Sequence, residues 1–490
     1  MKKIAAIIIF ATLGFLAFAQ SQMTNTGKDA PTPQWQSYEE ALFQIGKLNH
    51  IEIDIPKDVW KKLLQNPEKK EYCRCSVTIN AERFDNVGIR AKGASSLEDV
   101  FAMKSDRYSF VVKLNKYVKG QKYHGLSKLM LNNNIGDATQ MKDVIAYDMS
   151  RHLGLPTPLC NYASITLNGK YFGCYLVVEP VDKNFCKRNY PFAPTNLYKP
   201  YHNLTYTGDN IADYAGIGDE AKINGGEESL RNVIKALKSV ATGIDIEKYV
   251  DVDNVLKYMA LQTMAVNFDG LTGGNEHNYF LRESDGRINL IPWDYNLAWG
   301  GYQDDGGEEE GDEEFEDFAT YIAERERYLA SLSAEQLDSV RNAERELNFQ
   351  EGVKVVNFPI DIPFSCNIEK CSFFMNLLNN KDYKAAYYKY LKMLCVDYVQ
   401  NGVFERTVST VKQEIGDFAG KEANAFYNNE QFHEAVQMLE KVLNKRALSV
   451  LGQINGTIPS TWEAQELEHQ KLIDCTDIDL SKMGNCGDFE

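Results

Sequence analysis

A predicted hairpin with a polar residue at each end constrains the fold of this 490-residue chain more than any other feature. Residues 279–281 have the apolar character of a strand, Asp285-Gly286 is a turn pair, and residues 288–293 form the return strand. Asn278 immediately precedes the first strand, and Asp294 immediately follows the second. Because the two ends of a hairpin lie side by side, we predict that both polar side chains face the same space.

A second carboxylate, Asp269, lies nine positions before Asn278 in the loop that leads to the hairpin. Phosphoryl transfer requires such groups in one place, since one Asp orients the attacking hydroxyl while another Asp and an Asn hold the magnesium. The order departs from that of eukaryotic protein kinases. No His-Arg precedes Asp269, its separation from Asn278 is longer, and Tyr-Asn rather than Phe-Gly follows Asp294.

An alternative interpretation assigns these residues to ordinary local structure. Asp-Gly pairs such as Asp269-Gly270 are usually turns, and Asp294 could be a helix cap or a turn residue. The neighbouring residues favour a site, because residues 293–299 are largely aromatic and apolar around Asp294. An unpaired charge in such a run is costly without a cation.

The motifs NFDG, HNYFL and IPWDYNLAWG around this hairpin resemble the catalytic region of the CotH family of atypical, secreted protein kinases. The resemblance extends upstream through IRAKGASS, RYSFVVKL and LNNNIGDATQMKDVIAYDMSRHLGLPTP to LNGKYFGCYLVVEPVDKNF, and more weakly downstream through residues 383–451. Each motif alone is weak, but the combination is specific.

The resemblance implies an α+β fold of the two-lobed, atypical protein-kinase type, with an antiparallel, β-rich N-lobe and a mainly helical C-lobe. It implies ATP with Mg²⁺ or Mn²⁺ as cofactors and a secreted or surface protein as the phosphate acceptor. Asp269 would be the catalytic base or orienting residue, and Asn278 and Asp294 would be the metal ligands. The rival functions are a non-catalytic surface or coat scaffold and a divalent-metal or carbohydrate-binding module.

Alternating residues near the start of the chain predict antiparallel strands, over residues 51–55, 76–79 and 87–90. The loop after the third strand, residues 92–96, contains a glycine and two serines that can present N–H groups and hydroxyls to phosphate. A plain polar loop is the alternative. IRAKGASS resembles the family's R-x-K/R-G-x-S-S loop, which implies a phosphate cradle made by Gly93, Ser95 and Ser96.

Lys113, on a predicted strand over residues 108–114, is comparable to the strand lysine that touches nucleotide phosphates in kinases. Its apolar neighbours indicate a partly buried strand. Lys92 and Lys104 are competing candidates, and a solvated strand lysine is the alternative interpretation.

A helix is predicted from the capping box at residues 137–140 to Gly154. Its apolar stripe is formed by Met141, Val144, Ile145 and Met149. Asp148 falls on that stripe and needs a cation, so we predict that it pairs with Lys113, with Asp143 as an exposed alternative.

Asn168-Gly169 predicts a hairpin turn between strands over residues 162–167 and 170–178. The second strand ends at Glu179-Pro180, because proline removes a backbone donor from the sheet. In a kinase this point would be the hinge that meets the adenine, so Glu179 is a candidate cofactor-binding residue.

The predicted organisation is a signal peptide over residues 1–19, a flexible lead over 20–37, a β-rich N-lobe with one helix over 38–180, a helical C-lobe with the catalytic hairpin over 181–455, and a tail over 456–490. Helices are expected over residues 227–242 and 252–266, and three amphipathic helices over 373–451. An acidic loop over 303–330 includes nine acidic residues within positions 304–316. Such runs are usually solvated, and the alternative is a calcium or basic-substrate site.

Composition excludes some partners. No segment beyond the leader reaches the ~18–20 apolar residues of a membrane helix, so we predict an exported protein without an integral membrane segment. Removal of Lys2 and Lys3 changes the net charge from −16 to −18, which argues against nucleic acid. Ten cysteines permit disulfides in an exported chain, although cysteines in strand-like runs, such as Cys174, are often buried thiols.

Overall fold

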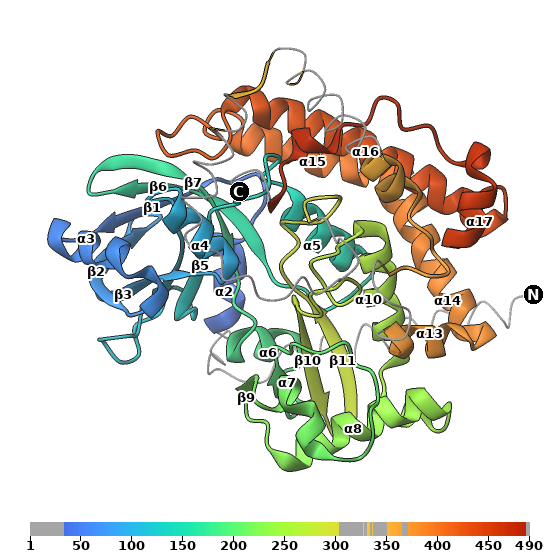
Figure 1. Cartoon of the computed structure of the whole chain (residues 1–490). Helices are drawn as coiled ribbons and strands as arrows, with labels where there is room; N and C mark the ends of the chain where they lie inside the picture. Colours follow the sequence, from blue (N-terminus) through green and yellow to red (C-terminus); the bar gives the residue numbers. More distant parts are fainter. Residues whose placement is uncertain are drawn as a thin grey trace, which may run out of the picture.

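The structure is a computed structural model that describes residues 34–302, 350–364 and 371–486, with positions 327, 331–333 and 336 between them. The predicted signal peptide, all but the last residues of the flexible lead, and nearly all of the acidic loop lie outside these residues. The described chain is a mixed α+β structure with a sheet-rich N-terminal part and a helical C-terminal part (Figure 1).

Seven strands near the N-terminus form a closed barrel in the order β1-β2-β3-β4-β5-β7-β6. Their bounds are β1 (Asn49–Asp54), β2 (Cys73–Ile79), β3 (Glu82–Lys92), β4 (Ser109–Lys113), β5 (Lys128–Asn132), β6 (Cys160–Leu167) and β7 (Lys170–Val178). Neighbours pair antiparallel except β1 and β6, whose parallel pairing, with Ile51 opposite Ile165, closes the barrel. Closure pairs strands that would otherwise be sheet edges.

Alternation of apolar and polar residues along the strands explains which side chains fill the barrel interior. On β1, Ile51 and Ile53 are buried while Glu52 is exposed, because successive side chains point to opposite faces. Val77 and Ile79 on β2 follow the same rule. The predicted strands and both predicted turns are therefore confirmed, whereas the closing β1–β6 pairing was not predicted.

Short helices surround the barrel and link it to the second sheet. They are α2 (Gln34–Leu42), α3 (Lys57–Gln65), η1 (Pro67–Lys69), α4 (Ser95–Ala102), α5 (Lys142–His152) and α6 (Lys183–Asn189). The predicted helix over the capping box begins later than expected, at Lys142, because Asp137 accepts hydrogen bonds from Thr139 N at 2.9 Å and Lys142 N at 3.0 Å. The four predicted stripe residues are all buried.

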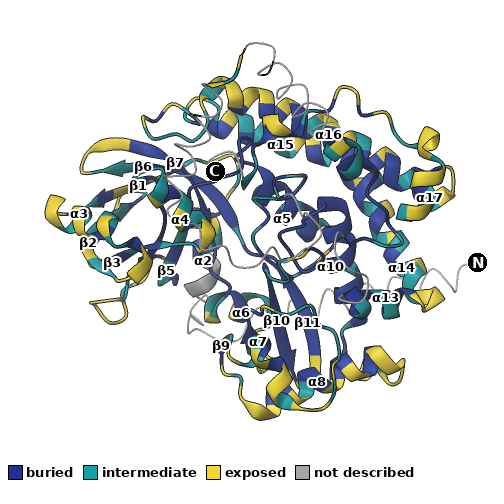
Figure 2. Ribbon diagram, viewed as in Figure 1, coloured by how far each residue is buried: buried dark blue, intermediate teal, exposed yellow. Residues whose placement is uncertain are grey.

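The second sheet has the order β11-β10-β8-β9. Its strands are β8 (Asn196–Tyr198), β9 (Ala221–Ile223), β10 (Tyr279–Ser284) and β11 (Arg287–Pro292). The predicted hairpin is thus confirmed, with Tyr279 opposite Pro292 at its open end. Figure 2 shows that β10 and β11 are buried along most of their length, as is α10 (Val252–Ala265) beside them.

Helices make up most of the rest of the described chain. They are η2 (Ile211–Tyr214), α7 (Ala215–Gly218), α8 (Glu227–Thr242), α9 (Ile246–Tyr249), α13 (Ser372–Leu378), α14 (Lys381–Lys392), the π-helix η4 (Met393–Gln400), α15 (Val403–Ile415), α16 (Asn429–Asn455), α17 (Trp462–Leu467), η5 (His469–Lys471) and η6 (Leu480–Met483). The three helices predicted over residues 373–451 are therefore five helical elements. None of the described helices is long and apolar enough to cross a membrane.

Most cysteines are thiols in the protein interior. The free thiols of the described residues include Cys73, Cys75, Cys160, Cys174, Cys186, Cys395 and Cys475. Burial raises the pKa of Cys75 and Cys160 to about 12, so these thiols stay protonated at neutral pH. Cys366 lies outside the described residues.

Candidate functional site

Asn278 directly precedes β10, and Asp294 follows β11 by two residues, so both lie at the open end of the hairpin. Both residues have left-handed backbones, with φ of 58° and 62°. Asn and Asp tolerate this conformation better than other residues with a Cβ. The left-handed backbone therefore explains in part why Asn and Asp occupy these two positions, and the contacts of their side chains must explain the rest.

Asp269 is held by Asn278 and by two neighbouring polar residues. Nδ2 of Asn278 donates to the Asp269 carboxylate at 2.7 Å and to its carbonyl at 2.8 Å. Nδ2 of Asn275 donates to the other carboxylate oxygen at 2.8 Å, and Nε2 of His277 lies 3.6 Å from that oxygen. The hairpin and the preceding loop thus meet as predicted, at Asp269 and Asn278.

Burial raises the pKa of Asp269 to about 6, and the charge of Asp294 adds to this rise. The charges of His277 and Lys199 and the hydrogen bond from Asn275 oppose it. A carboxyl with this pKa is mostly ionised at pH 7 yet remains a useful proton acceptor.

Asp294 is fixed through its backbone by helix α5. Its N–H donates to the hydroxyl of Tyr147 at 3.1 Å, and the N–H of Tyr295 donates to Oδ1 of Asp143 at 2.7 Å. The Asp294 carboxylate itself makes no hydrogen bond or ion pair within the described ranges. Its oxygens therefore remain available to a cation.

Asp143 is the buried carboxylate of this site, with 3% of its surface exposed. Burial, and after it the charge of Asp294, raises the pKa of Asp143 to about 7, while the hydrogen bond from Tyr295 N opposes the shift. Its Oδ2 has no hydrogen-bond partner among the described residues. This corrects the expectation of an exposed Asp143.

Lys92, the last residue of β3, carries a charge that interacts with both Asp294 and Asp143. Burial lowers the pKa of Lys92, and the charges of Asp294 and Asp143 oppose that change. Lys199, which directly follows β8, contributes a second positive charge that acts on both Lys92 and Asp269. The site therefore combines three carboxylates with two lysines.

Lys113 and Asp148 are not brought together, which corrects the predicted pairing. Lys113 is the last residue of β4, opposite Gly88 and Lys128, and is partly exposed. The Asp148 carboxylate accepts hydrogen bonds from Thr407 Oγ1 at 2.8 Å and Tyr398 Oη at 3.0 Å and also lies near Arg151. Asp148 thus joins α5 to the C-terminal helices. The third candidate lysine, Lys104, is exposed.

The loop predicted to cradle phosphate leads from β3 into helix α4. Gly93 has φ of +124°, and a Cβ at this position would lie 2.7 Å from Oγ of Ser96. Ser95 and Ser96 form the first turn of α4, where backbone N–H groups have no acceptor within the helix. Gly93 directly follows Lys92, so the loop begins at the site.

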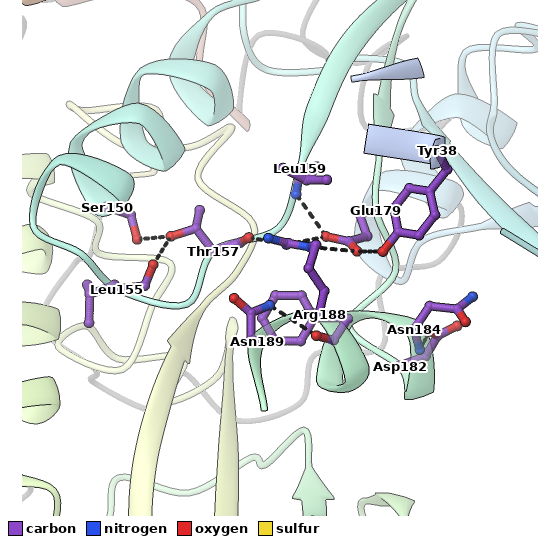
Figure 3. A network of polar contacts seen from close by, with 11 residues as sticks. Tyr38, Ser150, Leu155, Thr157, Leu159, Glu179, Asp182, Asn184, Arg188 and Asn189 are labelled. Carbon is purple, nitrogen blue, oxygen red and sulfur yellow. Dashed lines mark hydrogen bonds and ion pairs between the residues drawn. The ribbon is translucent and has the colours of Figure 1, made fainter. Parts of the chain in front are cut away.

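Glu179 lies at the end of β7, but its carboxylate is occupied by protein contacts (Figure 3). It is fully buried and accepts hydrogen bonds from Arg188 Nη2 at 2.6 Å, from the hydroxyl of Tyr38 at 2.5 Å and from the backbone N–H of Leu159 at 3.1 Å. Arg188 also donates to the carbonyl of Thr157 at 2.8 Å. The Glu179 side chain therefore joins α2, α6 and the residue before β6. The N–H of Glu179 donates to the carbonyl of Leu159 at 2.8 Å, which leaves the carbonyl of residue 179 for nucleotide contacts.

The donor chemistry fits magnesium or manganese better than zinc. No group of three or more His, Cys, Asp or Glu side chains is arranged for a metal ion in the described part of the chain. Mg²⁺ needs fewer protein ligands, because one or two carboxylates are normally completed by phosphate oxygens and water. Asp294 and the oxygen of Asn278 are hard donors of that kind.

Sequence reasoning missed part of this site. Asn275, His277 and Lys199 were not predicted, and Lys92 was only a competitor to Lys113. For three of these residues, position in the sequence was the feature that could have identified them. Asn275 and His277 lie between Asp269 and Asn278, and Lys92 lies inside IRAKGASS. Lys199 follows a three-residue strand and had no such signal.

Two comparisons with known proteins show which sequences this chain resembles. The family model described as CotH kinase protein matches residues 89–450. Inner spore coat protein H of Bacillus subtilis (strain 168) is 26% identical over 267 residues, which make up 50% of this chain and 66% of the relative. The match therefore spans just under two thirds of that relative.

Proposed function

The chain belongs to the CotH kinase protein family, and we propose on this premise that it is an exported kinase. The proposed reaction transfers the γ-phosphate of ATP to a hydroxyl side chain of a secreted or surface protein. In the proposed two-lobed description, residues 38–180 are the N-lobe and residues 181–455 are the C-lobe.

One observation supports this proposal above all others: the carboxylate of Asp294 makes no hydrogen bond or ion pair with the described residues, although it interacts with the charges of Asp143 and Asp269. A structural turn residue in this environment would be expected to have a hydrogen bond. Carboxylates that repel each other in a partly buried site are favoured by a cation. A divalent ion with the phosphates of ATP would satisfy both requirements.

Each residue has a proposed role. Asn278 and Asp294 would hold Mg²⁺ or Mn²⁺, which when bound neutralises negative charge on the phosphates. Lys92, in preference to Lys113, would contact phosphate oxygens, because its charge interacts with Asp294 and Asp143. Gly93, Ser95 and Ser96 would supply the cradle, with backbone N–H groups directed at anionic oxygens.

Asp269 would orient the acceptor hydroxyl and take its proton. Hydrogen bonds from Asn275 and Asn278 fix the carboxylate, so little reorientation is needed when the acceptor arrives. The pKa of Asp269 is closer to neutral pH than that of an exposed Asp, so its carboxylate is a better proton acceptor. Lys199 would limit this rise through its positive charge.

The test is incubation of the mature protein with γ-labelled ATP and Mn²⁺, with casein and the protein itself as acceptors. Transfer of label that requires Mn²⁺ is expected. Metal-dependent ATP binding without transfer would favour the non-catalytic scaffold. Metal binding that ATP does not affect would favour the metal or carbohydrate module.

A further inference from the structure

The C-terminal tail, defined here as residues 479–486, lies beyond the region that the family model matches. We propose that this tail braces the loop that carries Asp294, so that its residues are positioning residues for the site. The inference rests on the proposed role of Asp294.

The tail is bonded to the start of α5. Ala138 N donates to the carbonyl of Met483 at 3.0 Å, and Nζ of Lys142 donates to the carbonyl of Gly484 at 3.0 Å. Lys142 is fully buried. The bond fixes a buried ammonium at the start of α5, and hydrogen bonds to a charged group are stronger than those between neutral groups.

The same tail is bonded to the far end of the loop that begins at Asp294. The N–H of Cys486 donates to the carbonyl of Gly301 at 2.9 Å. A Cβ added to Gly300 would lie 2.6 Å from a methyl group of Leu480, and one added to Gly301 would lie 2.8 Å from Nζ of Lys142. Tail, loop and helix therefore meet in one tightly packed place.

Together with contacts from α5, these contacts fix both ends of the loop that begins at Asp294. Helix α5 holds the start of the loop through Tyr147 and Asp143, which bind the N–H groups of Asp294 and Tyr295. The tail holds both the first turn of α5 and the end of the loop at Gly301. A shift of the tail would thus loosen both supports of Asp294 together.

The loop needs external support because it has unfavourable features of its own. Asp294 has φ of 62°, and the carboxylates of Asp143 and Asp269 share its surroundings. Strain and like-charge repulsion of this kind persist only when the surrounding structure fixes the backbone.

The tail is itself anchored firmly enough to act as a support. Leu480 and Met483 are buried, and η6 packs against α16. Lys482 pairs with Glu434 at 3.3 Å on the outer side. The buried apolar residues provide most of the attachment, since exposed ion pairs contribute little.

Gly484 offers a sharp test. It has φ of +75°, and a Cβ there would lie 2.6 Å from the Tyr427 hydroxyl and 2.9 Å from Ala138 N, so Gly484→Val should displace the tail. Gly456→Val is the matched control, because Gly456 has φ of +78° and open space around the added Cβ. Both variants carry the same backbone penalty, and only Gly484→Val disrupts the brace.

Two measurements are made on both variants: hydrogen exchange of amides 294–301, and label transfer as a function of Mn²⁺ concentration. For Gly484→Val we expect faster exchange at these amides and turnover reduced roughly tenfold, with a higher Mn²⁺ requirement, relative to Gly456→Val. Equal exchange and equal turnover in the two variants would overturn the brace.

If Gly484→Val does not fold, Lys142→Met replaces it, with Lys142→Arg as the variant that can still donate to Gly484. The exchange measurement separates this inference from the proposed function. Faster exchange in a chain whose wild-type form transfers no label would support the brace and reject the kinase activity. Unchanged exchange in an active chain would reject the brace alone.

Discussion

The carboxylate of Asp143 accepts a hydrogen bond from the backbone N–H of Tyr295 at 2.7 Å. This contact joins helix α5, which follows the barrel strand β5, to the residue next to Asp294 at the end of β11. The barrel and the second sheet are therefore connected at the candidate metal ligand, and an acid that sequence analysis placed on the surface makes the connection.

Two replacements of Asp143 should distinguish the contribution of its hydrogen bond to stability from that of its charge. Asp143→Ala leaves the buried Tyr295 N–H without an acceptor, so unfolding free energy should fall by roughly 1–3 kcal/mol. Asp143→Asn can keep the acceptor and should lose less. Urea unfolding of both variants measures the difference, and equal losses would show that the hydrogen bond contributes little.

Lys92→Met should weaken binding of ATP at fixed Mn²⁺ by roughly tenfold or more, because it removes the cation beside Asp294 and Asp143. Lys113→Met is the matched control on the neighbouring strand and should have little effect. Fluorescence titration with a labelled ATP analogue compares them. The reverse order of effects would return the phosphate contact to Lys113.

Asp269→Asn should reduce turnover by roughly 10²-fold or more while ATP affinity hardly changes, since a proton acceptor acts in the transition state. The amide has the size of the carboxyl but only one acceptor oxygen, so one of the hydrogen bonds from Asn275 and Asn278 is lost and unfolding free energy should fall by about 1 kcal/mol. A variant that is less stable but turns over normally would make Asp269 a turn residue only.

Stability should depend on pH through Glu414, a buried residue of α15 that accepts a hydrogen bond from Gly46 N at 2.6 Å. Burial raises the pKa of Glu414 from 4.5 to about 7, and the Gly46 bond opposes the rise. The folded state therefore binds the proton more tightly, and stability falls as pH rises from about 4.5 to 7 by up to roughly 3 kcal/mol.

Glu414→Gln should remove this part of the pH dependence. The stability of the variant relative to that of the wild type should therefore be higher at pH 8 than at pH 4. Glu405→Gln on the same helix is exposed and serves as the control. Urea unfolding at both pH values tests this, and an identical pH profile in wild type and Glu414→Gln would contradict the account.

Local features of the fold could be predicted from the sequence because they depend on neighbouring residues. The hairpins at Asn168-Gly169 and Asp285-Gly286 follow from turn chemistry, and the positions of Asn278 and Asp294 at the open end of the second hairpin follow from that hairpin. The closing pair β1–β6 joins residues more than a hundred positions apart, and no local pattern encodes such a pairing.

The choice between candidate side chains was harder for a physical reason. Helix α5 is buried on nearly every side, so its apolar stripe could not distinguish buried Asp143 from partly exposed Asp148. Apolar neighbours indicated that the strand of Lys113 is buried, but not where the side chain of its last residue lies. Glu179 was correctly placed at a strand end, while its partner Arg188 could not be foreseen.

The most direct test of the central claim is metal-dependent nucleotide binding and label transfer by Asp294→Asn. Asn tolerates the left-handed backbone and keeps the N–H that donates to Tyr147, so the fold should be retained. The account predicts loss of transfer and loss of the Mn²⁺-dependent part of ATP affinity, with an unchanged melting temperature. An Asp294→Asn variant whose Mn²⁺-dependent ATP affinity equals that of the wild type would contradict it.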